Sequence, residues 1–162
     1  MPNHSGRKSL VIRLNNQQNR IRLPISRLRA IGRLILGSLG LKRAEASFLF
    51  VTDRRMKYLN RKFKRKNRPT DVRSFSQLEE RQIPDLSRRC LLGDVIISVD
   101  TTKRQAPLYG NSFLKELVLY MIHGILHILG FDDQRPRSRK IMRRKEEEIM
   151  IKIEKQFSFL SQ

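Results

Sequence analysis

The chain has 162 residues, the size of one domain with a single hydrophobic core. Its one cysteine excludes an internal disulfide, and hence a secreted disulfide scaffold, and this favours a cytoplasmic protein. Lys and Arg number 35 against 15 Asp and Glu, so the formal net charge is +20. Such a charge indicates a phosphate-rich partner, most simply nucleic acid, although a solvated basic surface would also carry it.

The first half of the chain predicts two strands, each followed by a basic helix. Residues 9–14 (SLVIRL) suit a strand, and Pro24 can open a helix whose apolar residues keep helical spacing up to Leu39. Such a helix can lie on a membrane, but packing inside a domain is commoner. Residues 46–53 (ASFLFVTD) suit a strand ending in an aspartate cap, and residues 56–63 suit a second helix.

The middle of the chain predicts a short extended segment at 72–75, a polar loop at 76–90 and a β-branched strand at 91–100 (LLGDVIISVD). Strands and helices therefore do not alternate strictly. This order predicts an α+β fold, a single domain over residues 1–162 in which a small mixed β-sheet packs against helices.

Two helices are predicted in the last third. The first covers 112–129, capped by Ser112 or Asn111 and stopped by Gly130, and it is apolar enough to run through the core. The second begins at Pro136, with Glu148 and Lys152 paired four residues apart. The longest mostly apolar stretch, 117–131, has 15 residues, fewer than the roughly 20 that a spanning helix needs, so no membrane partner is expected.

A histidine pair marks the apolar helix as a candidate metal site. His123 and His127 lie four residues apart, so both side chains leave the same helix face and can reach one metal ion. The surrounding apolar residues offer these histidines no hydrogen-bond partner, and a metal would satisfy both. The alternative is a pair of ordinary core histidines bonded to backbone carbonyls.

A third ligand is expected just beyond the helix. Gly130 allows the chain to double back in a left-handed turn, which makes Asp133 the candidate and Asp132 its close rival. Alternatively, Asp133 could cap the helix that Pro136 opens. Local geometry leaves these possibilities open.

These residues belong to a set of linked motifs that resembles the YbeY family of bacterial endoribonucleases, the ribosomal RNA maturation factors. HGILHILGFD (123–132) resembles the family's metal-binding helix, and LNRKFKRKNRPTDVRSFS (59–76) and LLGDVIIS (91–98) resemble two further family segments. EEEIM (146–150) also fits. Asp133 stands where the family has a third zinc-binding histidine, and Lys64 stands where it has an arginine.

The resemblance implies a metal-dependent endoribonuclease that cleaves single-stranded RNA in ribosomal RNA maturation and ribosome quality control. The implied metal ligands are His123, His127 and Asp133, holding one zinc ion per chain, and His123, His127 and Lys64 are the implied catalytic residues. An aspartate ligand can also favour manganese or iron. The implied partners are ribosomal RNA and the small ribosomal subunit. Ser74 and Phe75 either line the RNA groove or serve structural roles.

Two other functions compete with this one. A metallopeptidase of the usual helical type needs a glutamate directly after the first histidine as general base, and this chain has Gly124 there. A non-catalytic RNA-binding assembly factor would need the same basic charge as a nuclease. Nothing in the sequence separates that second alternative from an enzyme.

The basic segment RKFKRKNR (61–68) generates a first prediction. Log affinity for single-stranded RNA should fall linearly with log salt, with a slope of about −0.7 per neutralised phosphate. Changing Lys64 and Arg65 together to alanine should flatten this slope, measured by fluorescence anisotropy over a salt series. Arg61 and Arg68 remain as neighbouring cations in that variant, and an unchanged slope would place the RNA-binding face elsewhere.

Overall fold

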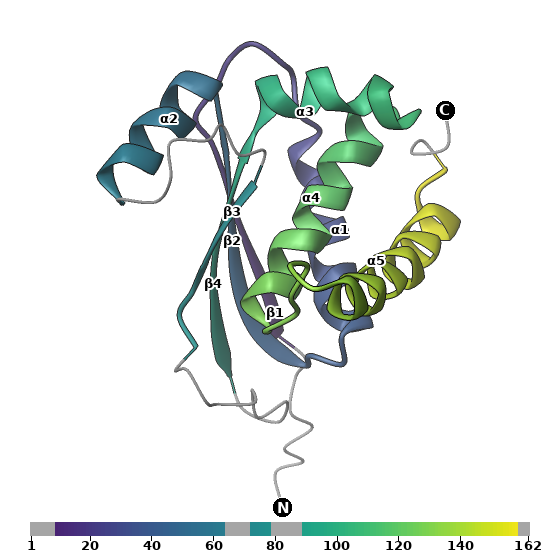
Figure 1. Ribbon diagram of the computed structural model, residues 1–162. Helices are drawn as coiled ribbons and strands as arrows, with labels where there is room; N and C mark the ends of the chain where they lie inside the picture. The colour runs from purple at the N-terminus through teal and green to yellow at the C-terminus, as the bar shows by residue number, and fades with distance from the viewer. Residues whose placement is uncertain (1–8, 64–71, 79–88, 159–162) are drawn as a thin grey trace, which may run out of the picture.

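The structure, a computed structural model, describes residues 9–63, 72–78 and 89–158. Its elements follow in chain order, and nearly all lie where the sequence predicts them (Figure 1). They are β1 (Ser9–Asn16), α1 (Ile25–Ser38), β2 (Arg43–Val51), α2 (Asp53–Lys62), β3 (Val72–Ser76), β4 (Cys90–Ser98), α3 (Val99–Gln105), the 3₁₀ turn η1 (Ala106–Tyr109), α4 (Phe113–Ile128) and α5 (Pro136–Gln156).

The four strands form one mixed sheet in the order β1-β2-β4-β3. β1, β2 and β4 run parallel, whereas β3 pairs antiparallel with β4 at one edge. Parallel neighbours need a crossover between them, and α1 supplies it between β1 and β2. The predicted α+β class, with a small mixed sheet packed against helices, is confirmed.

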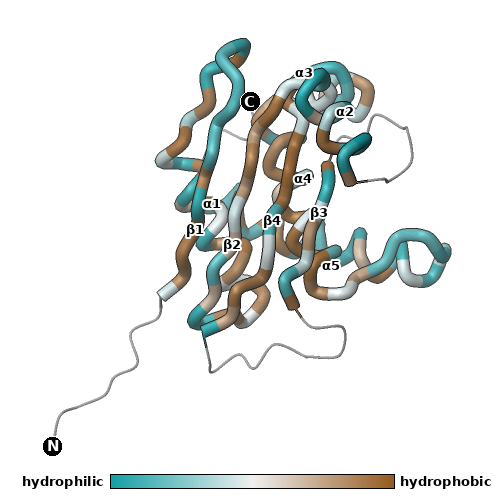
Figure 2. The backbone as a smooth tube through the Cα atoms, turned by 90° about the vertical axis from the view of Figure 1, so that its left-hand side faces the viewer, coloured by the Kyte–Doolittle hydropathy of each residue, from teal (hydrophilic) through white to brown (hydrophobic). Residues whose placement is uncertain are grey.

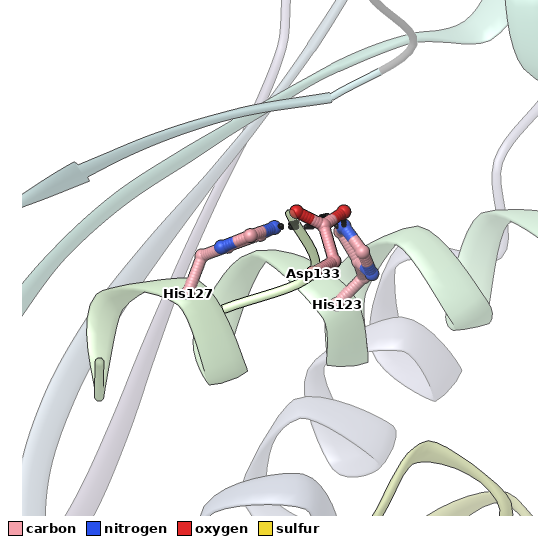
Figure 3. Close-up of side chains that lie close together, drawn as sticks. All are labelled: His123, His127 and Asp133. Carbon is pink, nitrogen blue, oxygen red and sulfur yellow. Dashed lines mark hydrogen bonds and ion pairs between the residues drawn. The ribbon is translucent and has the colours of Figure 1, made fainter. Parts of the chain in front are cut away.

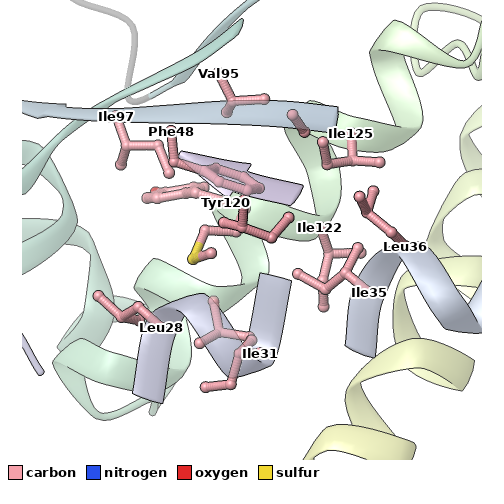
Figure 4. Close-up of a cluster of buried hydrophobic side chains, with 14 of the residues drawn as sticks. Leu28, Ile31, Ile35, Leu36, Phe48, Val95, Ile97, Tyr120, Ile122 and Ile125 are labelled. Carbon is pink, nitrogen blue, oxygen red and sulfur yellow. The ribbon is translucent and has the colours of Figure 1, made fainter. Parts of the chain in front are cut away.

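Helices α1 and α4 cover one face of the sheet and α5 packs against both of them, while α2 lies on the other side of the sheet (Figures 1 and 2). The main hydrophobic core, drawn in Figure 4, lies between the sheet and helices α1 and α4 and continues to the inner side of α5. Strand alternation points Phe48 of β2 and Val95 and Ile97 of β4 into it, and all three are fully buried or nearly so. α1 presents Ile31 and Ile35 from below, so the predicted basic helix packs within the fold.

Helix α4 runs through this core as the sequence predicts, with ten of its sixteen residues buried. Ser112 is its N-cap and accepts a hydrogen bond from the Lys115 amide. Within the described ranges, no helix is both long and apolar enough to cross a membrane.

Three local predictions were wrong. Thr52, rather than Asp53, caps α2, because its hydroxyl accepts from the Arg55 amide. The strand predicted to reach residue 100 ends at Ser98, whose side chain caps the unpredicted helix α3. Glu148 pairs with Lys145, three residues before it, at 3.2 Å rather than with Lys152.

A polar network fastens the start of α2 to α3. Asp53 accepts hydrogen bonds from the Ser98 and Thr101 hydroxyls, and its second oxygen lies 2.7 Å from the Arg104 guanidinium. Burial raises the pKa of Asp53, but these three donors together outweigh it, so the pKa is lowered overall. Asp53 therefore stays ionised and holds α2 at the end of β4.

The approach of α4 to the sheet is closest at Gly124. A Cβ atom at this position would lie 2.4 Å from one methyl carbon of Val95 and 3.2 Å from the Ser74 hydroxyl. The Ser74 hydroxyl donates to the Gly124 carbonyl at 2.9 Å, which joins β3 to α4. Gly124 is thus required by the distance between helix and sheet.

We therefore predict that Gly124→Ala destabilises the protein by about 1–3 kcal/mol through overpacking. Val95→Ala removes the two methyl carbons that a Cβ at 124 would meet. Chemical denaturation of both single variants and the double variant should show that the double change costs less than the sum of the two single changes. Simple additivity would mean that Val95 is not what limits the size of residue 124.

Candidate metal centre

His123 and His127 project from the last two turns of α4, and their rings meet at their outer nitrogens. The two Nε2 atoms lie 2.9 Å apart, and the rings are nearly perpendicular. Both Nε2 atoms also face the Asp133 carboxylate, and these contacts favour a shared site over the alternative of ordinary core histidines bonded to backbone carbonyls. Figure 3 shows both rings directed at one point above the helix.

Glu146 of α5 fixes the orientation of His123. Its carboxylate lies 2.5 Å from His123 Nδ1, on the side of the ring that faces away from His127. A carboxylate that accepts the Nδ1 proton turns the Nε2 lone pair of His123 towards His127 and Asp133, a common arrangement around metal-ligating histidines. Glu146 was not among the site residues predicted from the sequence, because helical spacing alone cannot select it from the run 146–148.

A tight reversal of the chain after α4 brings Asp133 to the histidines. The Phe131 amide donates to the Leu126 carbonyl and the Gly130 amide to the His127 carbonyl, a Schellman motif. Gly130 adopts the left-handed conformation that this motif needs, with φ of 92°. Asp133 Oδ2 then lies 3.6 Å from His123 Nε2 and 3.7 Å from His127 Nε2.

The rival roles for the two aspartates separate clearly in the structure. Asp132 accepts a hydrogen bond from the Gln134 amide in a local turn and does not join the histidine group. Arg135, rather than Asp133, occupies the N-cap position of α5. The Asp133 backbone carbonyl is held by Arg139, whose Nε donates to it at 2.9 Å. The Asp133 carboxylate is therefore left to face the histidines.

The three side chains fit a small divalent metal. Tetrahedral zinc with ligands at about 2.0–2.1 Å has its ligand atoms about 3.3 Å apart. The three observed separations of 2.9, 3.6 and 3.7 Å lie on both sides of that value. One nitrogen from each histidine and one Asp133 oxygen could thus hold one ion, and this group is the one that the described residues offer for a metal.

The centre is open to solvent on one side. The exposed fractions of the His123, His127 and Asp133 side chains are 26%, 31% and 42%, so a metal held there would keep a position for water or substrate. A cavity of about 460 Å³ adjoins it. This cavity is lined by His123, Asp133, Arg139, Met142, Arg143 and Glu146.

The remaining predicted site residues lie elsewhere or outside the described part. Lys64 falls in the segment 64–71, outside the described residues. Ser74 contacts the Gly124 carbonyl, and Phe75 lies on the opposite face of the sheet, where its ring packs against Phe63 at 5.3 Å between centroids. These contacts favour structural roles for Ser74 and Phe75.

Fold and site together define a small α+β protein with a candidate centre of two histidines and one carboxylate. Comparison with known proteins gives the family: the sequence profile described as Endoribonuclease YbeY matches residues 13–154. This match covers most of the chain. The chain belongs to the YbeY endoribonuclease family.

Relatives and a solved structure agree with this assignment. A protein named Endoribonuclease YbeY from Pelotomaculum thermopropionicum is 43% identical over 68% of this chain and 72% of its own length. Another with that name, from Anaeromyxobacter dehalogenans, is 41% identical over 86% of this chain and 70% of its own length. One from Desulforamulus reducens is 34% identical over 89% of this chain and 97% of its own. A solution structure of a Thermotoga maritima protein shares the fold, with a TM-score of 0.64, 22% identity and coverage of 91% of this chain and 92% of that one.

The adjacent aspartates provide a matched test of the centre. Asp133→Asn should weaken zinc affinity by at least about 100-fold, because loss of an outer hydrogen-bond partner alone costs about 10–100-fold. Asp132→Asn removes the same charge but keeps the oxygen that accepts from the Gln134 amide. The zinc affinity of this variant should therefore match that of the parent protein. Competition titration with a chromogenic chelator measures both. Equal affinity in the two variants would remove Asp133 from the site.

Proposed function

We propose that this protein is a metal-dependent endoribonuclease that cleaves single-stranded RNA. The observation that carries the proposal is the group formed by His123 and His127 of α4 and Asp133 of the following segment, beside an open cavity. Membership of the YbeY endoribonuclease family and the net charge of +20 support an RNA substrate.

Each residue of the centre has a distinct part in this proposal. His123, His127 and Asp133 would hold the metal, and Glu146 keeps His123 in the tautomer that can bind it. A bound divalent ion would polarise a phosphoryl oxygen and help to generate the attacking nucleophile from water. Lys64 is proposed to bind the scissile phosphate as a point charge, without the bidentate fork of an arginine.

The metal is proposed to be zinc, with manganese or iron as alternatives. Two imidazoles and one carboxylate suit all three, and the harder oxygen donor of Asp133 moves the preference towards manganese or iron relative to three histidines. Asp133 also lowers the formal charge of a zinc centre from +2 to +1. Such a centre would activate water less strongly than one with three neutral ligands.

The biological substrate is proposed to be ribosomal RNA, in maturation and quality control of the small ribosomal subunit in the cytoplasm. The family resemblance carries this part of the proposal. A non-catalytic RNA-binding assembly factor remains the alternative, since binding and cleavage use the same basic charge. Cleavage of the RNA phosphodiester bond distinguishes the endoribonuclease from the assembly factor.

A metallopeptidase conflicts with the packing of α4. The general base of that class would stand at position 124, where even a Cβ atom would lie 2.4 Å from Val95. A glutamate there would need the helix to move away from the sheet, and the histidines would move with it.

Cleavage assays on single-stranded and duplex RNA of equal length test the function. We expect cleavage of the single strand alone, loss of cleavage with a chelator, and recovery on adding one equivalent of zinc or manganese per chain. His123→Ala and His127→Ala should each fall to background, because each removes a ligand. Asp132→Asn, purified in parallel, should retain the parent rate and so control for a general effect of substitution near the centre, while the inactive histidine variants control for contaminating nuclease. RNA binding without metal-dependent cleavage in the parent protein would favour the assembly factor.

A further inference from the structure

A second hollow adjoins the metal centre along the N-terminal half of α5. It measures about 450 Å³ and is lined by Pro136, Arg139, Lys140, Arg143, Arg144 and Glu147. Arg139 and Arg143 also line the cavity beside His123 and Asp133, so the two hollows share one wall. Figure 2 shows this hydrophilic part of α5 projecting past β3.

Helical spacing explains how the two hollows come to share residues. Arg139, Met142, Arg143 and Glu146 follow the pattern i, i+3, i+4, i+7 and therefore occupy one face of α5. Met142 is buried and Glu146 contacts His123, so this face is the one turned towards the metal centre. Lys140 and Arg144 lie next to it, one step around the helix, and both are exposed.

The charge on this half of the helix opposes helix formation. Residues 135–145 contain seven Lys and Arg and no Asp or Glu. The first turn of α5 has no acidic residue, and no side chain caps it, although the positive end of the helix dipole favours anions there. The pairs Arg139–Arg143 and Lys140–Arg144 place like charges four residues apart, which is also unfavourable.

Within the described part of the chain, several of these cations have no anionic partner. Among the residues that the structure describes, no acidic side chain pairs with Lys140, Arg143 or Arg144. Arg139 is held by backbone carbonyls of Asp133 and Gln134 rather than by a carboxylate. A bound anion would thus offset both the repulsion between these side chains and the helix dipole.

We propose that the N-terminal half of α5 is a phosphate-binding track for the RNA strand whose scissile phosphate lies at the metal centre. This inference rests on the proposed function, because it places neighbouring phosphates of the same strand beside Arg143, Arg144 and Lys140. Guanidinium groups match the geometry of phosphate oxygens, and the shared wall makes the track continuous with the centre. The positive charge also offsets Asp133 and Glu146, which would otherwise repel an approaching phosphodiester.

The test compares two variants that lose equal charge from the same helix. Arg143→Gln with Arg144→Gln alters the track, and Lys152→Gln with Lys155→Gln alters the exposed C-terminal half, which lines neither hollow. Binding of a short labelled single-stranded 2′-O-methyl RNA is followed by anisotropy over a salt series. The arginine variant should lose about 0.7 of salt slope per phosphate contact, about 1.4 in all, and the lysine variant should match the parent. Arg143→Lys with Arg144→Lys should keep the parent slope, because the slope follows charge.

Three results would overturn the track: an unchanged slope in the arginine variant, an equal loss in the lysine variant, or equal loss in the Arg→Lys variant. Cleavage of unmodified RNA by the same preparations tests the proposed function separately. A flattened slope without cleavage by the parent protein would keep the track and reject the nuclease. Metal-dependent cleavage by the parent protein, with an unchanged salt slope in the arginine variant, would keep the nuclease and reject the track.

Discussion

The candidate metal centre depends on how closely α4 approaches the sheet at Gly124. The absence of a side chain there lets the helix backbone lie against Val95 and accept a hydrogen bond from Ser74. With that contact fixed, the neighbouring turn carries His123 and His127 on the side of the helix that opens to solvent. The orientation of the histidines is therefore set by core packing, and the proposed chemistry would use the side of α4 that does not face the sheet.

Side chains of both charges surround the candidate metal centre. Asp133 and Glu146 bring two carboxylates to a site that is proposed to receive a phosphodiester, and α5 brings arginines to the same cavity. Glu146 and Arg143 lie three residues apart on one helix, so the element that orients His123 also carries positive charge to the entrance. α5 thus links the geometry of the metal ligands to the electrostatics of substrate approach.

Periodicity and motif spacing predicted the strands, the long helices, the α+β class and the pairing of His123 with His127, because these features depend on residues close together in the chain. Spacing left Asp132 and Asp133 as rivals for the third position, and the family resemblance favoured Asp133. The helix α3 was missed because its cap, Ser98, ends an apolar strand and reads as part of it. Glu146 was missed because its contact with His123 spans 23 residues and depends on how α5 crosses α4. The placement of β3 at the sheet edge likewise follows from tertiary pairing, which local patterns do not encode.

The Schellman reversal at Gly130 confines the three candidate ligands to an eleven-residue stretch, 123–133. An ion held by such a stretch joins no distant parts of the chain, and an unfolded chain would present the same donors close together. Binding to the unfolded state reduces the stabilisation that a ligand gives to the native state. A metal bound by this stretch would therefore add less to the stability of the fold than one whose ligands came from distant segments. The hydrophobic core formed by the sheet and helices α1, α4 and α5 would carry most of the stability.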